Sequence, residues 1–290
     1  MQYIGRFAPS PSGPLHFGSL VAALGSYLQA RANNGKWLVR IEDIDPPREV
    51  AGAADAILKT LEAYGLHWDD SLLYQHDRYD AYQAQIDAWL DTGAAYYCQC
   101  TRRQIKDAGG LYPGTCRHRT LGNEGSAVRV CIDNPVTEFV DIKHGVMSLD
   151  PAMAAEDFII KRRDGLFAYN LAVVLDDIHQ GVTEVVRGAD LIEPTGRQVS
   201  LYQKLGAPQV SYLHLPLALN SNGNKLSKQN HAPAIDNARP GPAMEAALAF
   251  LGHPPPKELY GAPVTDLLQW GIENWQISKL PSKTEVITAF

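Results

Sequence analysis

The spacing of hydrophobic positions changes sharply near the start of the chain. Residues 3–7 are mostly apolar and predict a short buried strand, whereas from Ser19 to Arg31 the apolar residues recur at helical spacing. Three prolines and two glycines lie between these segments, at positions 8–18, and exclude regular structure there. The sequence therefore predicts a strand, a tight loop and a helix. The backbone N–H groups and the positive dipole end at such a helix start form a natural phosphate site.

Strand and helix patterns then alternate along most of the chain. The ranges with strand patterns are 37–42, 158–161, 183–186 and 212–219. The ranges with helical patterns are 51–64, 79–90, 169–176 and 193–205, followed near the end by 242–251, 264–270 and 274–280. This alternation predicts an α/β fold with a doubly wound parallel sheet, extended by a short C-terminal helical region.

The alternation is interrupted at 96–156, a stretch rich in glycine, arginine and turn residues, with short strands expected at 127–132 and 137–142. We interpret this stretch as an insertion. Residues 1–95 and 157–219 then form the two halves of the α/β domain, and residues 220–290 contain a polar loop and the C-terminal helices.

Composition narrows the class of protein. The 290 residues are 45% hydrophobic and 20% charged, as in ordinary globular proteins. The chain has no run long enough for a transmembrane helix and no signal pattern at its start, so a cytoplasmic protein without membrane contact is expected. Its net charge of −6 argues against indiscriminate nucleic-acid binding, but a local basic surface would suffice for an RNA partner. Four cysteines in this length do not indicate a disulfide framework.

Three basic residues are candidates for binding phosphate. His16 lies at the mouth of the first helix, where an imidazole can donate to a phosphate oxygen, although a single histidine there is also compatible with an ordinary turn. Lys225 and Lys228 lie three residues apart in a polar loop and suit a phosphate chain as point charges, the alternative being two surface lysines. Their occurrence together with His16 favours a phosphate site.

Charged residues lie at the ends of three predicted strands, namely Arg6, Glu42 and Arg187. Ligands of open parallel sheets bind beyond the carboxyl ends of the strands, so these side chains are expected to face one crevice. Glu42 is interpreted as a substrate contact, whereas capping of the next helix is sufficient to explain Asp45. For Arg187 the alternative is a salt bridge with Asp190.

The cysteines of the insertion suggest a metal site. Cys98 and Cys100, followed by Cys116 after a glycine loop, have a spacing that can close a tetrahedral zinc site, the alternative being three unliganded thiols. Candidates for the fourth ligand are Tyr112, His118 and Cys131. Chemistry alone ranks His118 first, because tyrosine is an unusual zinc ligand.

Several of these motifs resemble a known family. His16-x-Gly18-Ser19 and the Lys225-Leu-Ser-Lys228 loop resemble the two signatures of class I aminoacyl-tRNA synthetases. The segments 6–13 (RFAPSPSG), 40–45 (RIEDID) and 186–191 (VRGADL) are similar to the glutamyl branch. Only roughly 60 residues follow the lysine loop, too few for an anticodon-binding domain of usual size. In content and length the chain therefore resembles the glutamyl-queuosine tRNA(Asp) synthetases, which are truncated paralogs of glutamyl-tRNA synthetase.

The resemblance implies a Rossmann-like catalytic domain and a two-step reaction. L-glutamate is activated by ATP without tRNA, and is then transferred to the queuosine base at the wobble position of tRNA(Asp). Mg²⁺ is expected with ATP, one structural Zn²⁺ in the insertion, and a monomeric protein. Two alternatives remain: conventional charging of the tRNA 3′ end with a separate anticodon-binding partner, and a synthetase-like RNA-binding module without catalysis.

The resemblance also assigns residues, each at a position that matches the family motifs. For glutamate these are Arg6, Phe7, Ala8, Pro9, Ser10, Glu42, Tyr169 and Arg187. For ATP they are His16, Gly18, Ser19 and Lys228, and for catalysis His16, Lys225 and Lys228. For zinc they are Cys98, Cys100, Tyr112 and Cys116, so that Tyr112 replaces His118 as the expected fourth ligand. Ser19 stands where the class signature has a second histidine.

Overall fold

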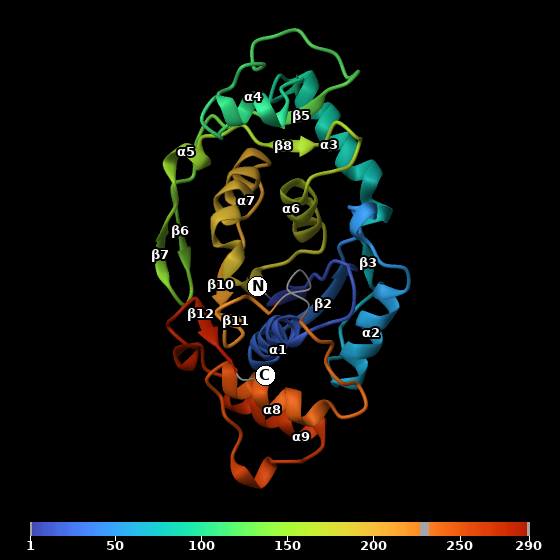
Figure 1. The fold of residues 1–290 in the computed structure, drawn as a ribbon, viewed down its shortest axis with the longest axis vertical. Coiled ribbons are helices and arrows are strands. Elements are labelled where there is room, and N and C mark those ends of the chain that lie inside the picture. The colour runs from blue at the N-terminus through green and yellow to red at the C-terminus, as the bar shows by residue number, and fades with distance from the viewer. Residues whose placement is uncertain (1, 227–231, 289–290) are drawn as a thin grey trace.

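The computed structural model describes residues 2–226 and 232–288, and its centre is a parallel sheet (Figure 1). β1 (Ile4–Phe7) pairs with β2 (Lys36–Ile41), and β2 pairs with β3 (Leu73–Tyr74), all parallel. β9 (Glu184–Gly188) lies on the other side of β1, where the Thr183 N–H donates to the Ile4 carbonyl at 2.9 Å. The order then continues to β10 (Ser211–Leu215), β6 (Glu138–Asp141) and β7 (Gly145–Ser148).

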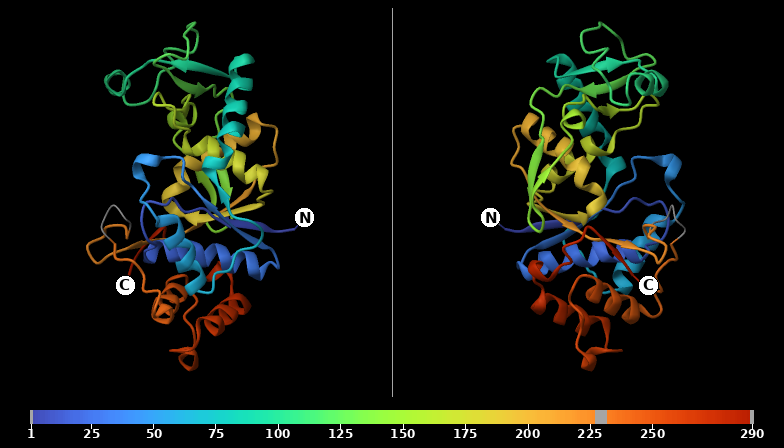
Figure 2. Two further views of the ribbon diagram at one scale, coloured as in Figure 1. Left: turned by 90° about the vertical axis from the view of Figure 1, so that its right-hand side faces the viewer. Right: turned by 60° about the vertical axis from the view of Figure 1, so that its left-hand side comes forward.

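Helices cover both faces of this sheet (Figure 2), where the blue, orange and red helices lie on one side and the yellow ones on the other. One face is covered by α1 (Phe17–Ala32), α8 (Pro240–Phe250) and α9 (Val264–Asn274), and the other by α3 (Tyr79–Asp91), α6 (Tyr169–His179) and α7 (Ile192–Lys204). Because strand side chains alternate, Val186 belongs to the first core and its neighbour Val185 to the second. The expected doubly wound α/β fold is confirmed.

A second, antiparallel sheet, whose first strand ends at Cys98, lies at the upper end of the molecule in Figure 1. It consists of β4 (Ala95–Cys98), β5 (Ala127–Val130) and β8 (Ile159–Lys161), and the helix α4 (Arg102–Asp107) follows β4. The expectation that 158–161 resumes the parallel sheet is wrong, because β8 pairs antiparallel with β5. The strand expected at 137–142 is β6, which pairs with β10 of the main sheet instead of staying within the insertion. A short alternating strand shows which of its faces is buried but does not identify its neighbour. The boundaries of the insertion as a domain stay a prediction.

Further helices, 3-10 turns and strands occur in the part of the chain that the structure describes. The remaining helices are α2 (Ala53–Ala63) and α5 (Pro151–Ala154), with single 3-10 turns at Pro46–Arg48, Gln75–Arg78, Ala189–Leu191, Lys257–Leu259 and Ile277–Lys279. The last of these replaces the helix expected at 274–280. The strand expected at 212–219 is divided at Pro216 into β10 and β11 (Leu217–Leu219), and β12 (Glu285–Ile287) pairs parallel with β11. None of the described helices is both long and apolar enough to cross a membrane.

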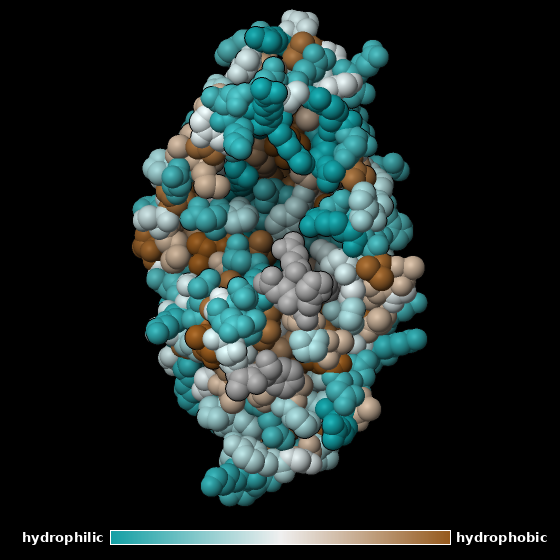
Figure 3. Space-filling view, viewed as in Figure 1, coloured by the Kyte–Doolittle hydropathy of each residue, from teal (hydrophilic) through white to brown (hydrophobic). Residues whose placement is uncertain are grey.

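Two valine side chains at the outer edge of the main sheet are exposed to solvent. Val140 of β6 and Val146 of β7 lie opposite each other in the ladder and are both about two-thirds exposed. Figure 3 shows hydrophobic surface gathered at the left-hand side, where Figure 1 places these two strands. The other face of β6 is buried and carries Phe139 and Asp141 toward the protein interior.

Candidate active site

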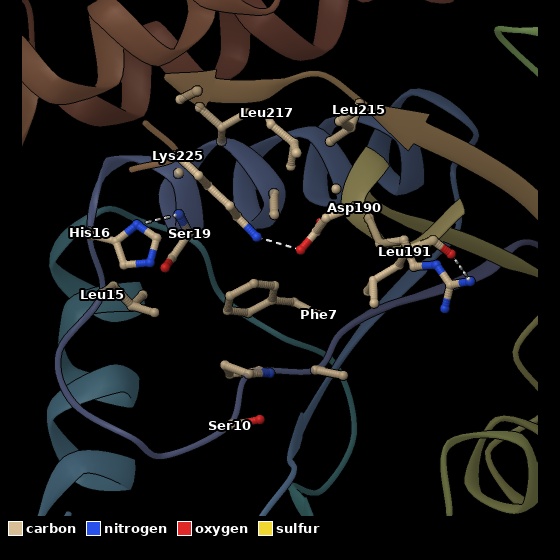
Figure 4. A pocket seen from close by; sticks show the side chains of 18 of the residues that line it. Phe7, Ser10, Leu15, His16, Ser19, Asp190, Leu191, Leu215, Leu217 and Lys225 are labelled. Atoms are coloured by element: carbon tan, nitrogen blue, oxygen red, sulfur yellow. Dashed lines mark hydrogen bonds and ion pairs between the residues drawn. The ribbon is translucent and has the colours of Figure 1, made fainter. Parts of the chain in front are cut away.

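A pocket of about 600 Å³ lies at the carboxyl ends of β1, β2, β9 and β10 (Figure 4). Each of the residues predicted for glutamate, ATP and catalysis lines it wherever the structure describes that residue. These are Arg6, Phe7, Ala8, Pro9, Ser10, His16, Gly18, Ser19, Glu42, Tyr169, Arg187 and Lys225. Lys228 lies outside the described residues. The strand ends bring these segments together because parallel strands present their carboxyl ends at one edge.

The start of α1 differs from the prediction that its first backbone N–H groups face a ligand. The helix begins at Phe17 and His16 is its N-cap, whose Nδ1 accepts a hydrogen bond from the Ser19 backbone N–H at 3.2 Å. One of the N–H groups expected to face a ligand is therefore bonded within the protein. Gly18 is required by a close approach: a Cβ at this position would lie 2.8 Å from the carbonyl oxygen of Leu226. The segment around Lys225 is thus held directly against the helix mouth.

Lys225 forms an ion pair with Asp190, and both residues line the pocket (Figure 4). Asp190 follows β9, and Lys225 follows β11. The alternative in which Asp190 pairs with Arg187 is therefore wrong, because the carboxylate is directed to the lysine that the fold brings across the pocket.

Arg6 and Glu42 belong to a buried network of charges beneath the pocket. Asp177 of α6 accepts from Arg6 Nε at 3.0 Å and from Arg40 Nη1 at 2.8 Å, and Arg40 Nη2 also donates to Glu42 at 3.3 Å. Burial alone would raise the pKa of Asp177, but the guanidinium groups of Arg6 and Arg40 hold it below its usual value. Burial raises the pKa of Glu42 against the opposing attraction of Arg40. The charge of Arg6 is therefore already balanced by a protein carboxylate.

Asp45 does not cap the turn that follows it. It occupies the N-cap position of the 3-10 turn Pro46–Arg48, but its side chain makes no capping hydrogen bond. Its carboxylate pairs instead with Arg48 Nε at 2.5 Å and with Arg162 Nη1 at 3.5 Å. The capping role expected for Asp45 is therefore wrong, since neighbouring guanidinium groups compete successfully for its oxygens.

Arg187 is surrounded by neutral partners. Its guanidinium donates to the side chains of Gln198 at 2.8 Å, Thr195 at 2.7 Å and Tyr169 at 3.4 Å, and to Nε2 of His214 at 3.2 Å. A further hydrogen bond reaches the Leu191 carbonyl at 3.2 Å. None of the ion pairs formed among residues 2–226 and 232–288 includes Arg187, although it is only 5% exposed. A buried cation without a carboxylate partner, at the wall of a pocket, suits an anionic ligand.

Several residues that support the site were given no role by the sequence reasoning. They are Arg40, Asp141, Asp177, Thr195, Gln198 and His214. A signal was present for some of them, because Arg40, Asp177 and His214 are polar residues inside otherwise apolar strands or helices and a buried charge requires a partner. The identity of each partner depends on strand order and was not readable from the sequence.

The three cysteines of the insertion meet at one point. The Sγ atoms of Cys98, Cys100 and Cys116 lie within 4.8 Å of one another, and Arg129 Nε donates to Cys98 Sγ at 3.3 Å. Thiolates in this arrangement fit Zn²⁺, which prefers soft sulfur ligands in tetrahedral sites. The donor set therefore fits the expected metal.

Of the three candidates for a fourth ligand, Tyr112 contacts this cluster. Its hydroxyl accepts from the Cys116 backbone N–H at 2.7 Å and interacts with the thiols of Cys98 and Cys116. His118 is exposed, and Cys131 Sγ is directed to the Gly93 carbonyl at 3.6 Å.

The fold and the pocket define a class of protein that binds ligands at the switch point of a doubly wound sheet. Comparison with known families makes this specific: residues 4–239 match the family described as tRNA synthetases class I (E and Q), catalytic domain. The chain belongs to this family, and it is an enzyme of the ligase class.

Three curated relatives that align over nearly the whole chain share the name glutamyl-Q tRNA(Asp) synthetase. The chain is 68% identical to the glutamyl-Q tRNA(Asp) synthetase of Photobacterium profundum, over 98% of this chain and 92% of that protein. It is 66% identical to the protein of that name from Vibrio parahaemolyticus, over 100% and 98%. It is 58% identical to the one from Escherichia coli (strain K12), over 100% and 94%. The resemblance stated from the sequence is therefore confirmed.

A solved structure supports the assignment of the chain to this family. A glutamate tRNA ligase from Elizabethkingia meningosepticum CCUG26117, described as in complex with its amino acid, is 25% identical with a TM-score of 0.79. The likeness covers 98% of this chain but spans 66% of the length of that one.

Proposed function

We propose that the protein activates L-glutamate with ATP to glutamyl-adenylate and transfers the glutamate from the adenylate to the queuosine base at the wobble position of tRNA(Asp), with release of AMP. The observation that carries the proposal is Arg187, a buried guanidinium that lines the pocket among neutral partners. The names of the relatives at 58–68% identity support the choice of glutamate and of the tRNA.

Glutamate needs a cation for a carboxylate and an anion for its ammonium group. Arg187 supplies the cation, and a substrate carboxylate would replace its longest contact, the 3.4 Å hydrogen bond to the Tyr169 hydroxyl. Glu42 also lines the pocket and supplies the anion, although it is paired with Arg40. Arg6 is a weaker candidate for a direct ion pair with the substrate, because Asp177 already neutralises it. Residues 6–10 line the same pocket.

The first chemical step is attack of the glutamate α-carboxylate oxygen on the α-phosphorus of ATP. The bond from that phosphorus to the bridging oxygen breaks, and pyrophosphate leaves. No protein nucleophile is required, so catalysis rests on positioning and on neutralising charge. His16, Gly18 and Ser19 border the space for the phosphates, and Lys225 leaves Asp190 to neutralise the departing pyrophosphate. Lys228 is proposed to act with Lys225, and Mg²⁺ accompanies ATP.

A single structural zinc ion is proposed for the insertion. Cys98, Cys100 and Cys116 would hold it through their thiolates, and the Tyr112 hydroxyl would complete the set. The cluster stands at one end of the small β4–β5–β8 sheet, so the metal would tie the loop after β4 to that sheet.

The proposal is tested in two stages. Glutamate-dependent exchange of labelled pyrophosphate into ATP, measured without tRNA, is expected if the protein forms the adenylate alone. Labelled glutamate is then offered with ATP to two bulk tRNA preparations, one with queuosine and one from cells unable to make it. Label on the queuosine-containing tRNA only supports the proposal, and equal label on both contradicts it. Absence of exchange with and without tRNA would indicate a module without catalysis.

Conventional charging of the 3′ end is the second candidate, favoured by the similarity to a solved glutamate tRNA ligase. Queuosine-containing tRNA that lacks its 3′-terminal adenosine separates the two reactions. Transfer to the base is expected to continue on this tRNA, whereas transfer to the 3′ end cannot occur.

A further inference from the structure

A buried chain of three side chains runs from the pocket to the edge of the main sheet. Arg187 on β9 donates from Nε to Nε2 of His214 on β10 at 3.2 Å, and Nδ1 of His214 lies 2.8 Å from Oδ2 of Asp141 on β6. The three residues are 5%, 0% and 1% exposed. Asp141 comes from the segment that sequence analysis placed in the insertion, so this hairpin reaches the ligand pocket through His214.

The hydrogen bonds determine which nitrogen of His214 carries the proton. Oδ2 of Asp141 is an acceptor and also receives the His214 backbone N–H at 2.9 Å, so Nδ1 is the protonated nitrogen. Nε2 then presents its lone pair to Arg187. Because Nε2 accepts from Arg187 and only Nδ1 carries a proton, the ring is neutral. Burial and the neighbouring Arg187 lower the pKa of His214, against the opposing hydrogen bond to Asp141.

Further contacts hold the Asp141 carboxylate and the His214 ring in place. Oδ1 of Asp141 accepts the backbone N–H groups of Lys143 and His144, each at 2.9 Å, which anchors the carboxylate in the turn between β6 and β7. The ring of His214 stacks on Tyr212 with an interplanar angle of 9°. Asp141 and His214 therefore form a rigid support behind Arg187.

This arrangement orients a guanidinium without neutralising it. Asp177 contacts Arg6 directly and balances its charge, whereas the negative charge behind Arg187 is separated from it by a neutral ring. The positive charge of Arg187 remains available to a ligand, while its Nε–H direction is fixed.

We propose that Asp141 and His214 are positioning residues that set the plane of the Arg187 guanidinium for a substrate carboxylate. This inference rests on the proposed role of Arg187 in glutamate binding. Its distinguishing consequence is that changes at His214 alter the KM for glutamate without altering the KM for ATP.

Two substitutions at one position separate the two hydrogen bonds of the ring. His214→Asn retains a side-chain N–H near Asp141 but has no acceptor within reach of Arg187. His214→Gln carries an amide oxygen to the region of Nε2. In pyrophosphate exchange, His214→Asn is expected to raise the KM for glutamate about tenfold, and His214→Gln to recover most of that loss.

His253 is a matched control in the C-terminal region. It is 2% exposed, lies outside the pocket, and also bonds through both ring nitrogens, to the Leu251 carbonyl and the Gln276 N–H. His253→Asn is expected to lower thermal stability while leaving both KM values unchanged. An unchanged glutamate KM in His214→Asn, or an equal rise in both KM values, would overturn the inference.

A measurement on the unaltered protein keeps the inference testable if the variants fail to fold. Nitrogen-15 spectra of labelled histidine report the tautomer of His214, and the Nδ1–H form is expected. The Nε2–H form would overturn the proposal, because that nitrogen could not accept from Arg187. Unaltered protein without glutamate-dependent exchange would contradict the proposed function itself, whereas active protein with an unaffected His214→Asn variant contradicts the positioning role alone.

Discussion

Lys225 and Asp190 form an ion pair across the mouth of the pocket, joining the segment after β11 to the turn after β9. Their side chains are 39% and 38% exposed. Pairs that remain this hydrated contribute about 1 kcal/mol or less, so the lysine can exchange its protein carboxylate for a phosphate at little cost. The ion pair therefore keeps Lys225 beside the pocket but is weak enough for Lys225 to leave Asp190.

Replacement of this lysine is expected to affect the chemical step. Lys225→Ala should slow pyrophosphate exchange about tenfold or more, because charge on the leaving pyrophosphate loses a cation, while the KM for glutamate is unchanged. Lys59→Ala, on the exposed side of α2, is the control and should retain full activity. A raised glutamate KM with an unchanged rate would contradict the assignment of Lys225.

Removal of the Arg187 charge is expected to affect glutamate binding. Arg187→Gln leaves a substrate carboxylate without its cation in a buried site, at a cost of about 3 kcal/mol, which corresponds to more than a hundredfold in KM. The assay is saturation of pyrophosphate exchange with glutamate. Arg103→Gln, whose side chain is 91% exposed on α4, is the matched control. Normal saturation of the Arg187 variant would exclude this residue from the glutamate site.

The cysteine cluster is expected to hold one zinc ion per chain. Elemental analysis of protein purified without chelators measures the metal directly, and Cys100→Ser should lose it because one of three clustered thiolates is removed. Cys131→Ser is the control, since this thiol is directed to the Gly93 carbonyl, and it should retain zinc. Absence of metal from the unaltered protein would count against the site.

Stability is expected to fall as the pH decreases below about 6.5, partly through His253. Burial lowers the pKa of His253, so in the folded protein it stays neutral, with Nδ1–H donated to Leu251 and Nε2 accepting from Gln276. The unfolded chain binds a proton at its ordinary pKa. The stabilising contribution of neutral His253 is therefore present in full above about pH 6.5 and is lost as the pH falls below this value. His76 acts in the opposite sense, because its hydrogen bond to Asp43 raises its pKa.

Comparison of variants isolates the contribution of His253. Free energies of unfolding from urea titrations between pH 5 and 7.5 are expected to depend less steeply on pH in His253→Asn, by about 1 kcal/mol per pH unit at most. Contributions from His76 and His214 are common to both proteins and cancel in the difference. Identical slopes would show that His253 titrates normally in the folded state.

Local sequence patterns were sufficient for most helices and for the pocket. The strand, loop and helix at the start of the chain were predicted because proline, glycine and apolar spacing act over a few residues. Arg6, Glu42 and Arg187 were predicted to converge because each lies at the end of a predicted parallel strand, and all three line the pocket. No knowledge of exact packing was needed for this, since the topology of a parallel sheet brings its strand ends together.

Pairing between distant segments was not predictable in the same way. The short strands β6 and β8 contain too few residues to indicate which sheet they join, and each was assigned to the wrong one. Asp190 was considered for Arg187, three residues away, but the fold brings it to Lys225. Proximity in sequence is a poor guide when two loops meet over one pocket.

The sequence by itself determined the family, the order of the main elements and the charged pocket residues Arg6, Glu42, Arg187 and Lys225, because these depend on motifs and on local periodicity. Only the tertiary structure decided how their charges are balanced. Asp177 neutralises Arg6. His214, by contrast, lies between Asp141 and Arg187, so the positive charge of Arg187 remains available to a ligand in the pocket. The reason is physical: ion pairs and hydrogen bonds act over a few ångströms, and these partners are separated by 27 to 171 residues along the chain.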